Sequence, residues 1–344
     1  MNRQFSIPVA FEASIEKALA TYNLSLADSK NLAKAVLQLS DYFIQHPQEN
    51  TPWNDKWAQI AYLCYYLPLN GARFSAVITE AQKQGFFAGL ENVVDFGAGL
   101  ATASMTLAQT ENFHFDLIES SGIPQQLIEK FFPHFKPRQW SQSLLAKSIS
   151  APEKTMAVFS YSLTELSQLP DWALNCEALM IVEPSTQQDG RRLMALRQKL
   201  IEKGYSLWAP CTHQQACPLL TQSKTDWCHD RIHFAAPEWF MKLEEHLPMK
   251  NRTLTFSYLL ARKKAAPLQQ TQEKTTVARI VSDQLKEKGK DRQMVCRGPD
   301  REFLSWLHKH GLEQEIPRGS LVELPSDLVK VSNELRLSAE LKII

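Results

Sequence analysis

The chain has 344 residues, of which 44% are hydrophobic and 22% are charged, and its formal net charge is +1. This composition is typical of a soluble globular protein of roughly two domains, and it argues against a protein that coats nucleic acid along its whole surface. No apolar run approaches the ~20 residues of a membrane span. The first twenty residues contain Glu12 and Glu16 and lack the apolar run of a signal peptide.

Residues 1–87 are expected to form a helical domain. Apolar residues recur there at three- and four-residue spacing, which is typical of amphipathic helices. The stretches with this spacing are 11–21, 27–45, 54–67 and 72–84. Prolines and a glycine between them, including Pro68 and Gly71, are expected to separate the helices.

Residues 88–265 change to alternating strands and helices. Strands are predicted at 93–96, 113–118, 156–161, 178–182, 205–209 and 254–260, and helices at 101–109, 123–132 and 191–203. This alternation predicts an α/β fold with an open, mostly parallel sheet. The last two strands are expected to form a terminal hairpin, with a cysteine-rich insertion at residues 209–240.

Residues 266–344 are expected to form a small basic C-terminal module behind a polar linker. Strands are predicted at 277–281 and 293–295, and a helix at 302–308. Between residues 262 and 301 there are eleven Lys or Arg and five Asp or Glu. This charge run fits either a patch that contacts RNA or a solvated face.

A strand that ends in glycines and opens a helix is typical of a nucleotide-binding loop. Residues 93–99, with Gly97 and Gly99, have this form, and Glu119 follows at the end of the next strand, where an acid would accept hydrogen bonds from ribose hydroxyls. Thr102 stands where a nicotinamide site has Gly or Ala, and Asp95, two residues before the first glycine, favours S-adenosylmethionine instead. A tight packing turn without any ligand is the remaining alternative.

Cysteines are concentrated in one window. Cys211, Cys217 and Cys228 lie within 18 residues, and Cys296 stands alone in the basic stretch, whereas Cys64 and Cys176 lie in apolar surroundings. Four thiolates that converge are suited to a structural zinc ion or an iron–sulfur cluster. Either of two nearby histidines, His213 and His229, could complete a zinc site, so the spacing does not choose the metal.

These features together resemble the methyltransferase-like small-ribosomal-subunit family, which includes the fungal mitoribosomal small-subunit protein 22, the human methyltransferase-like protein 17 and bacterial relatives. The likeness covers roughly residues 60 to 300. The segments that carry it are 93–99, 160–166 and 181–186, together with the cysteine segments 209–213, 217–219 and 226–229 and the late Cys296.

The resemblance implies a class I S-adenosylmethionine-dependent methyltransferase fold with a Rossmann-like sheet. It implies an S-adenosylmethionine pocket at Asp95, Gly97, Gly99 and Glu119. It also implies a [4Fe–4S] cluster, with zinc as the alternative. The implied cluster ligands are Cys211, Cys217, Cys228 and Cys296.

The resemblance further implies a factor for assembly of the small ribosomal subunit, with contacts to rRNA and ribosomal proteins, and with an active rRNA methyltransferase as the alternative. No membrane or DNA partner is expected. The absence of a recognisable transit or signal peptide favours a bacterial, cytoplasmic protein. Ala101 replaces the third glycine of many methyltransferases, and residues 160–163 lack the prolines that follow the fourth strand of amino-group methyltransferases. We therefore expect methyl transfer to be weak or absent.

Overall fold

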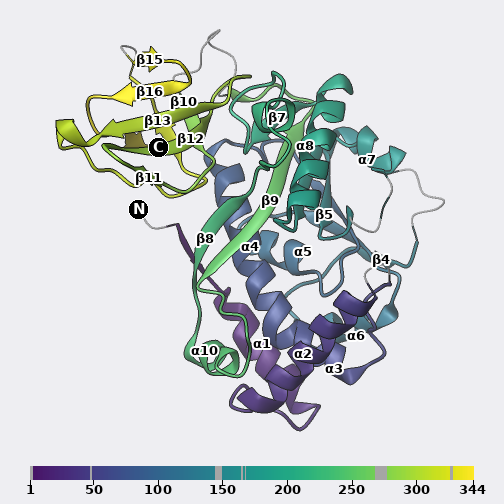
Figure 1. Cartoon of the computed structure of the whole chain (residues 1–344). Helices are drawn as coiled ribbons and strands as arrows, with labels where there is room; N and C mark the ends of the chain where they lie inside the picture. Colours follow the sequence, from purple (N-terminus) through teal and green to yellow (C-terminus); the bar gives the residue numbers. More distant parts are fainter. Residues whose placement is uncertain are drawn as a thin grey trace.

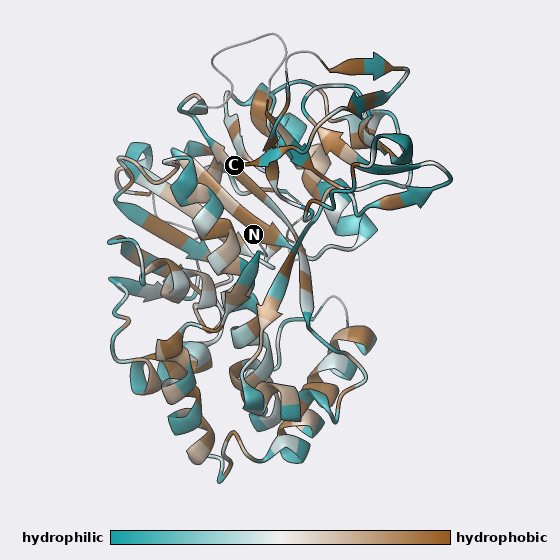
Figure 2. Cartoon of the chain, turned by 90° about the vertical axis from the view of Figure 1, so that its left-hand side faces the viewer, coloured by the Kyte–Doolittle hydropathy of each residue, from teal (hydrophilic) through white to brown (hydrophobic). Residues whose placement is uncertain are grey.

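The computed structural model describes residues 3–46, 49–143, 149–163, 166, 168–267, 277–325 and 328–344. A helical region lies at one end of the molecule and a small β-module at the other, with a large sheet between them (Figure 1). Hydrophobic residues concentrate along the central strands of the large sheet (Figure 2). Among the described residues, no helix is both long and apolar enough to cross a bilayer.

The helical region begins with a short strand, β1 (Gln4–Ser6), and continues with four α-helices and a π-helix. These are α1 (Val9–Ala20), α2 (Ser29–Gln45), α3 (Lys56–Ala61), the π-helix η1 (Tyr62–Tyr66) and α4 (Leu67–Lys83). The helices expected at 11–21 and 27–45 are therefore present. The strand β1 pairs in parallel with a strand of the large sheet, so the N-terminal segment is not purely helical.

The expected break at Pro68 and Gly71 was wrong. The elements α3, η1 and α4 follow one another without interruption. Pro68 lies in the first turn of α4, directly after the π-helix η1. A Cβ on Gly71 would approach Pro8 Cδ at 3.4 Å and Phe11 at 3.5 Å, so this glycine allows close packing against the start of α1.

The large sheet has nine strands. They are β1, β2 (Asn92–Phe96), β3 (His114–Ile118), β4 (Gln139–Ser141), β5 (Thr155–Ser160), β6 (Ala178–Glu183), β7 (Ser206–Ala209), β8 (Asp230–Ala235) and β9 (Thr253–Arg262). Their order is β1-β8-β9-β6-β5-β2-β3-β4, and β7 also pairs with β9. The strands β2 to β6 are mutually parallel, and β9 runs antiparallel to β6, β7 and β8.

This order, with one antiparallel strand next to the fifth parallel strand, is the class I methyltransferase arrangement, and the predicted fold class is confirmed. The terminal pair β7–β9 is antiparallel, as expected for the hairpin. The segment between them contains α9 (Pro218–Thr221), β8 and α10 (Glu238–Glu244). Neither β8 nor α10 was predicted from the sequence.

The central strands are buried on both faces, as parallel strands covered by helices usually are. In β5, Met156 and Val158 belong to the core on the α4 side, while Ala157 and Phe159 belong to the core on the opposite side. Besides α4, the helices that cover the sheet are α5 (Thr102–Leu107), α6 (Gly122–Phe131), α7 (Asp171–Asn175) and α8 (Gln187–Glu202).

The C-terminal module is an eight-stranded sheet. Its strands are β10 (Val277–Ile280), β11 (Leu285–Glu287), β12 (Lys290–Cys296), β13 (Glu302–Leu307), β14 (Leu321–Glu323), β15 (Val329–Val331), β16 (Glu334–Leu337) and β17 (Lys342–Ile343). Most of the expected polar linker falls on residues 268–276, outside the described residues.

The helix expected at 302–308 was wrong, because residues 302–307 form β13. This strand pairs with β12 on one side and β16 on the other. Leu304 and Trp306 enter the module's core, whereas Phe303 points to a cluster beside the cysteines. This alternation is the two-residue period of a strand. Pairing with β12 and β16 therefore makes residues 302–307 a strand and not a helix.

Candidate functional site

A cavity of about 900 Å³ lies at the carboxyl ends of β2, β3 and β5. In open α/β sheets, ligands bind at this edge. Its described wall includes the glycine loop, the end of β3, the residues after β5 and a part of the helical region. The lining residues that the sequence had indicated are Gly97, Gly99 and Glu119.

The glycine loop needs its glycines for backbone reasons. Gly97 has φ +66° and Gly99 has φ +49°, in the left-handed region that favours glycine. A Cβ on Gly97 would lie 2.7 Å from Ser162 Cβ, so the loop packs tightly against the residues after β5. Ala101 is the N-cap residue of α5 and has φ +50°, in the left-handed region that favours glycine.

Glu119 holds the glycine loop. Its Oε2 accepts a hydrogen bond from Gly99 N at 2.9 Å, and its Oε1 accepts one from Ser121 N at 3.0 Å. Oε1 also accepts a hydrogen bond from Ser120 Oγ at 3.2 Å, whereas Oε2 has a second lone pair that is suited to a hydroxyl donor. The structure thus brings Glu119, Gly97 and Gly99 together at one cavity, as the sequence predicted.

Asp95 takes a different position from the other three residues. Its side chain is fully buried on β2, accepts a hydrogen bond from Ser104 Oγ at 2.7 Å, and is not among the described residues that line the cavity. Burial raises the pKa of this carboxyl to about 7. Its second oxygen, Oδ1, has no hydrogen-bond partner among the described residues. Direct contact between Asp95 and a ligand therefore stays a prediction.

The helical region contributes a wall that sequence patterns did not indicate. Trp53 and Tyr62 line the cavity, with ring centroids 4.5 Å apart. Tyr62 begins the π-helix η1, and such elements are frequent at functional sites. Tyr161, just after β5, also lines the cavity and has a left-handed backbone, φ +58°. A long-range contact of this kind leaves no local signal in the sequence.

The four cysteines that the sequence singled out line a second cavity. Cys211 and Cys217 lie between β7 and α9, Cys228 lies just before β8, and Cys296 ends β12 of the C-terminal module. Apolar residues complete the wall, among them Leu193, Met194, Leu219, Tyr258, Leu259 and Val281. The structure therefore brings all four together from the hairpin segment and the β-module.

Hydrogen-bond donors face the sulfur atoms. Arg197, a buried residue on α8, donates from Nε to Cys211 Sγ at 3.1 Å, and backbone N–H groups of α9 donate to Cys217. His213 Nε2 lies 3.3 Å from Cys296 Sγ. Burial raises the pKa of the thiols of Cys217, Cys228 and Cys296, so thiolates here need a compensating cation.

The donors surround a cavity and do not converge on one point. Within the described residues, no group of three or more His, Cys, Asp or Glu side chains is close enough to hold a single metal ion. The two histidines that could complete a zinc site have different surroundings. His213 lies beside Cys296, whereas His229 stacks on Trp227 and contacts Arg318 Nη1.

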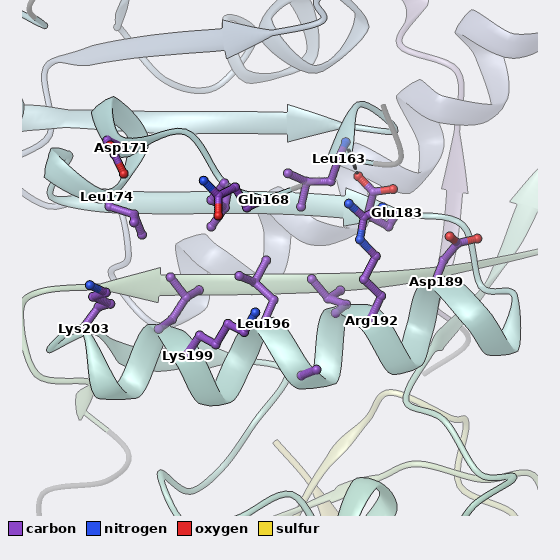
Figure 3. Close-up of a pocket in the computed structure, with 14 residues that line it drawn as sticks. Leu163, Gln168, Asp171, Leu174, Glu183, Asp189, Arg192, Leu196, Lys199 and Lys203 are labelled. Atoms are coloured by element: carbon purple, nitrogen blue, oxygen red, sulfur yellow. Dashed lines mark hydrogen bonds between the residues drawn. The ribbon is translucent and has the colours of Figure 1, made fainter. Parts of the chain in front are cut away.

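A third cavity, of about 350 Å³, lies between α8 and the loops after β5 and β6. Figure 3 shows Arg192, Lys199 and Lys203 along α8 on one side of it. Glu183, at the end of β6, accepts a hydrogen bond from Leu163 N at 3.0 Å, drawn as a dashed line. Glu183 therefore fixes the segment after β5 that also carries Tyr161.

The basic run of the C-terminal module is largely neutralised by ion pairs. Arg292 pairs with Glu287 and Glu334, and Lys290 pairs with the same two acids. Arg297 pairs with Glu302, and Arg301 pairs with Asp226. Lys286 and Lys288 are exposed. These ion pairs leave less unpaired positive charge in this stretch for a patch that contacts RNA.

The fold neighbours are methyltransferases of low sequence identity. The precorrin-6y C5,15-methyltransferase of Geobacter metallireducens has 11% identity and a TM-score of 0.36, over 56% of this chain and 88% of that chain. The magnesium protoporphyrin IX methyltransferase of Synechocystis has 11% identity and a TM-score of 0.33, over 67% and 100%. At such scores, the fold assignment rests on the strand order described above.

No curated protein gives a significant match to the chain. The family described as "Mitochondrial small ribosomal subunit Rsm22" matches residues 56–310, about three quarters of the chain. The match includes the glycine loop, Glu119 and all four clustered cysteines. The chain therefore belongs to the Rsm22 family of methyltransferase-like small-ribosomal-subunit proteins.

Proposed function

We propose that this protein is an assembly factor of the small ribosomal subunit that binds S-adenosylmethionine, a [4Fe–4S] cluster and rRNA. The observation that carries the proposal is the convergence of Cys211, Cys217 and Cys228 with Cys296, which comes from a separate sheet, on one cavity. Family membership supports the ribosomal role.

The donor set fits a cluster better than a zinc ion. A zinc ion needs four ligands around one atom, whereas each cysteine of a cubane binds a different iron atom, so the sulfurs stand further apart. Among the described residues that line the cavity, all the potential metal ligands of the Cys, His, Asp and Glu types are cysteines, the ligands that iron–sulfur clusters use. The buried guanidinium of Arg197 and the α9 amides would offset the negative charge of the cluster. When bound, the cluster would act as a cross-link between the methyltransferase sheet and the β-module.

The glycine-loop cavity fits S-adenosylmethionine. Glu119 presents carboxylate oxygens beside Gly99, where ribose hydroxyls would donate to them. Gly97 and Gly99 give the loop its left-handed backbone and let Ser162 and Trp53 pack closely against it, which shapes the wall of the cavity. The buried position of Asp95 argues for an indirect role, through Ser104 and the start of α5.

Two experiments test the proposal directly. Anaerobic purification followed by iron and sulfide assays should give one cubane per chain, and stoichiometric zinc without labile sulfide would contradict it. Affinity capture of the full chain from cells of its source, with sequencing of the retained RNA, should enrich small-subunit rRNA. Retention of unrelated RNA in equal amounts would contradict the ribosomal role.

An active rRNA methyltransferase is the second candidate, and the strained Tyr161 beside the cavity favours it. We expect it to be the weaker candidate, because residues 160–163 offer no carboxylate and no Asn/Asp-Pro-Pro motif to hold a target nitrogen. The two are distinguished by mass spectrometry of rRNA from a deletion strain and from a strain with a folded Gly97/Gly99 variant. Loss of the same methyl group in both strains would establish the enzyme.

A further inference from the structure

Aromatic rings form a large part of the wall of the glycine-loop cavity. Its described lining residues include Trp53, Tyr62, Phe96, Tyr161 and Trp172, and the one charged side chain among them is Glu119. Ring faces carry negative electrostatic potential, and a carboxylate carries negative charge, so both attract cations. The wall is thus chemically suited to a ligand with a positive charge.

The Trp53–Tyr62 pair is held firmly in place. The rings lie 4.5 Å apart between centroids, at an interplanar angle of 44°. Tyr62 OH lies 3.2 Å from Thr51 Oγ1, and Gln59 Nε2 donates to the carbonyl oxygen of Trp53 at 2.7 Å. Trp53 is only 6% exposed, so its position is fixed before a ligand enters.

Trp53 lies directly against the glycine loop. Its Cζ2 is 3.5 Å from the place that a Cβ on Gly99 would take. On another side of the same residue, Gly99 N donates to Glu119 Oε2 at 2.9 Å. Gly99 therefore lies next to both the indole ring of Trp53 and the carboxylate of Glu119.

The covalent structure of S-adenosylmethionine connects these two neighbours. Its positively charged sulfonium sulfur is bonded to C5′ of the ribose, so a ribose held at Glu119 puts the sulfur within one carbon of the sugar ring, at the glycine loop. S-adenosylhomocysteine has the same skeleton with a neutral thioether. The two ligands differ in charge at the atom that would face the aromatic wall.

We propose that the Trp53–Tyr62 wall makes this site select S-adenosylmethionine over S-adenosylhomocysteine. The proposal rests on the proposed cofactor site and adds its specificity. The protein would then respond more strongly to S-adenosylmethionine than to S-adenosylhomocysteine, even without transferring the methyl group. A cation–π contact of the usual strength corresponds to a preference of about 2- to 30-fold.

The test is calorimetry of the full chain with the two ligands and with sinefungin, an analogue that carries an amine in place of the sulfonium group. The wild type should bind S-adenosylmethionine and protonated sinefungin more tightly than S-adenosylhomocysteine. Trp53→Leu should weaken the two cationic ligands and bring all three affinities close together. Trp53→Phe, which keeps a ring, should retain most of the preference.

Trp57 provides a matched control, since it lies on α3 against Tyr42 and is not among the described residues that line the cavity. Trp57→Leu should leave the ratio of affinities unchanged. Equal or tighter binding of S-adenosylhomocysteine by the wild type, or an unchanged ratio in a folded Trp53→Leu variant, would overturn the selectivity and leave the cofactor site intact. Binding of none of the ligands would overturn the cofactor site itself.

Discussion

Arg279 and Cys296 are direct partners across the ladder between β10 and β12. The guanidinium group of Arg279 donates to the carbonyl oxygen of Pro210, the residue before Cys211, and forms a buried ion pair with Glu80 on α4. One side chain thus ties the segments of two clustered cysteines to the helical region. This connection exists independently of any metal.

Replacement of Arg279 by Met should strongly destabilise the protein. Burial alone would raise the pKa of Glu80, but the guanidinium of Arg279 holds it below its usual value, so removal of the arginine leaves a buried charge unpaired. Loss of one partner of such a pair costs about 3–5 kcal/mol of unfolding free energy. Urea unfolding measures the loss, and Glu80→Gln in the same chain should recover part of it.

The matched control is Lys242→Met, which removes an exposed ion pair with Glu238 on α10. Exposed pairs contribute little, so its unfolding midpoint should stay at the wild-type value. Arg279→Met should also lower the iron and sulfide content of anaerobically purified protein. A folded variant with full iron content would show that Arg279 does not position Cys211 and Cys296.

Replacement of Cys296 by Ser should abolish stable metal binding and loosen the β-module. Closure of the long loop between Cys228 and Cys296 costs entropy in the unfolded chain, and metal binding offsets that cost only when both ends are ligands. Hydrogen exchange should rise in β10 to β14 more than in β2 and β3. Cys176→Ser, at a buried cysteine that is not among the described residues lining the cavity, is the control and should retain the metal.

Elements with strong local sequence patterns could be predicted from the sequence. Gly97, Gly99 and Glu119 could be placed together because a strand, a turn and a second strand in a parallel sheet fix their positions. The terminal hairpin followed from the apolar runs of β7 and β9. By contrast, residues 302–307 have a composition compatible with helix or strand, and only pairing with β12 and β16 makes them a strand.

The wall residues of the cavity were not predictable in the same way. Trp53 reaches the glycine loop across more than forty residues of sequence, and its ring packs against Tyr62, the first residue of the π-helix. The burial of Asp95 was also missed, because a motif does not say on which side of the strand the carboxyl lies. The clustering of Cys211, Cys217 and Cys228 in the sequence indicated a metal site. That Cys296 lies at the same cavity depends on the position of β12 in the folded β-module.

Replacement of Glu119 by Ala should weaken S-adenosylmethionine binding by about ten- to hundredfold, since ribose hydroxyls left without acceptors cost about 1–3 kcal/mol. The variant also loses the acceptor of Gly99 N, so Glu119→Gln, which keeps a carbonyl oxygen there, separates the two effects. Glu119→Gln should keep the hydrogen bond from Gly99 N and restore only part of the affinity for S-adenosylmethionine. If calorimetry gives an unchanged affinity in both variants, Glu119 does not bind the ribose.

Replacement of Asp95 by Asn should reduce the pH dependence of stability. The folded pKa of about 7 lies above the ordinary value of 3.8, so the folded state holds a proton that the unfolded state releases. Protonation of Asp95 therefore stabilises the folded state, and this contribution is fully present below about pH 4 and is lost as the pH rises through 7. Its upper bound is roughly 4 kcal/mol. Melting temperatures from pH 4 to 8 should fall less in Asp95→Asn than in the wild type, whereas Asp171→Asn, at an exposed site, should follow the wild type.

Replacement of Lys286 and Lys288 by Glu should weaken association with the small subunit. Both are exposed near β11, whereas Lys290, Arg292 and their basic neighbours are engaged in ion pairs and have less charge to offer a phosphate. Phosphate contacts release counterions, so loss of two of them should lower the slope of log affinity against log salt by roughly 1–2. The control is Lys17→Glu on α1, at the opposite end of the molecule, which should leave the slope unchanged. Equal slopes for all three proteins would mean that the exposed lysines of the β-module form only a solvated face and that rRNA contacts lie elsewhere.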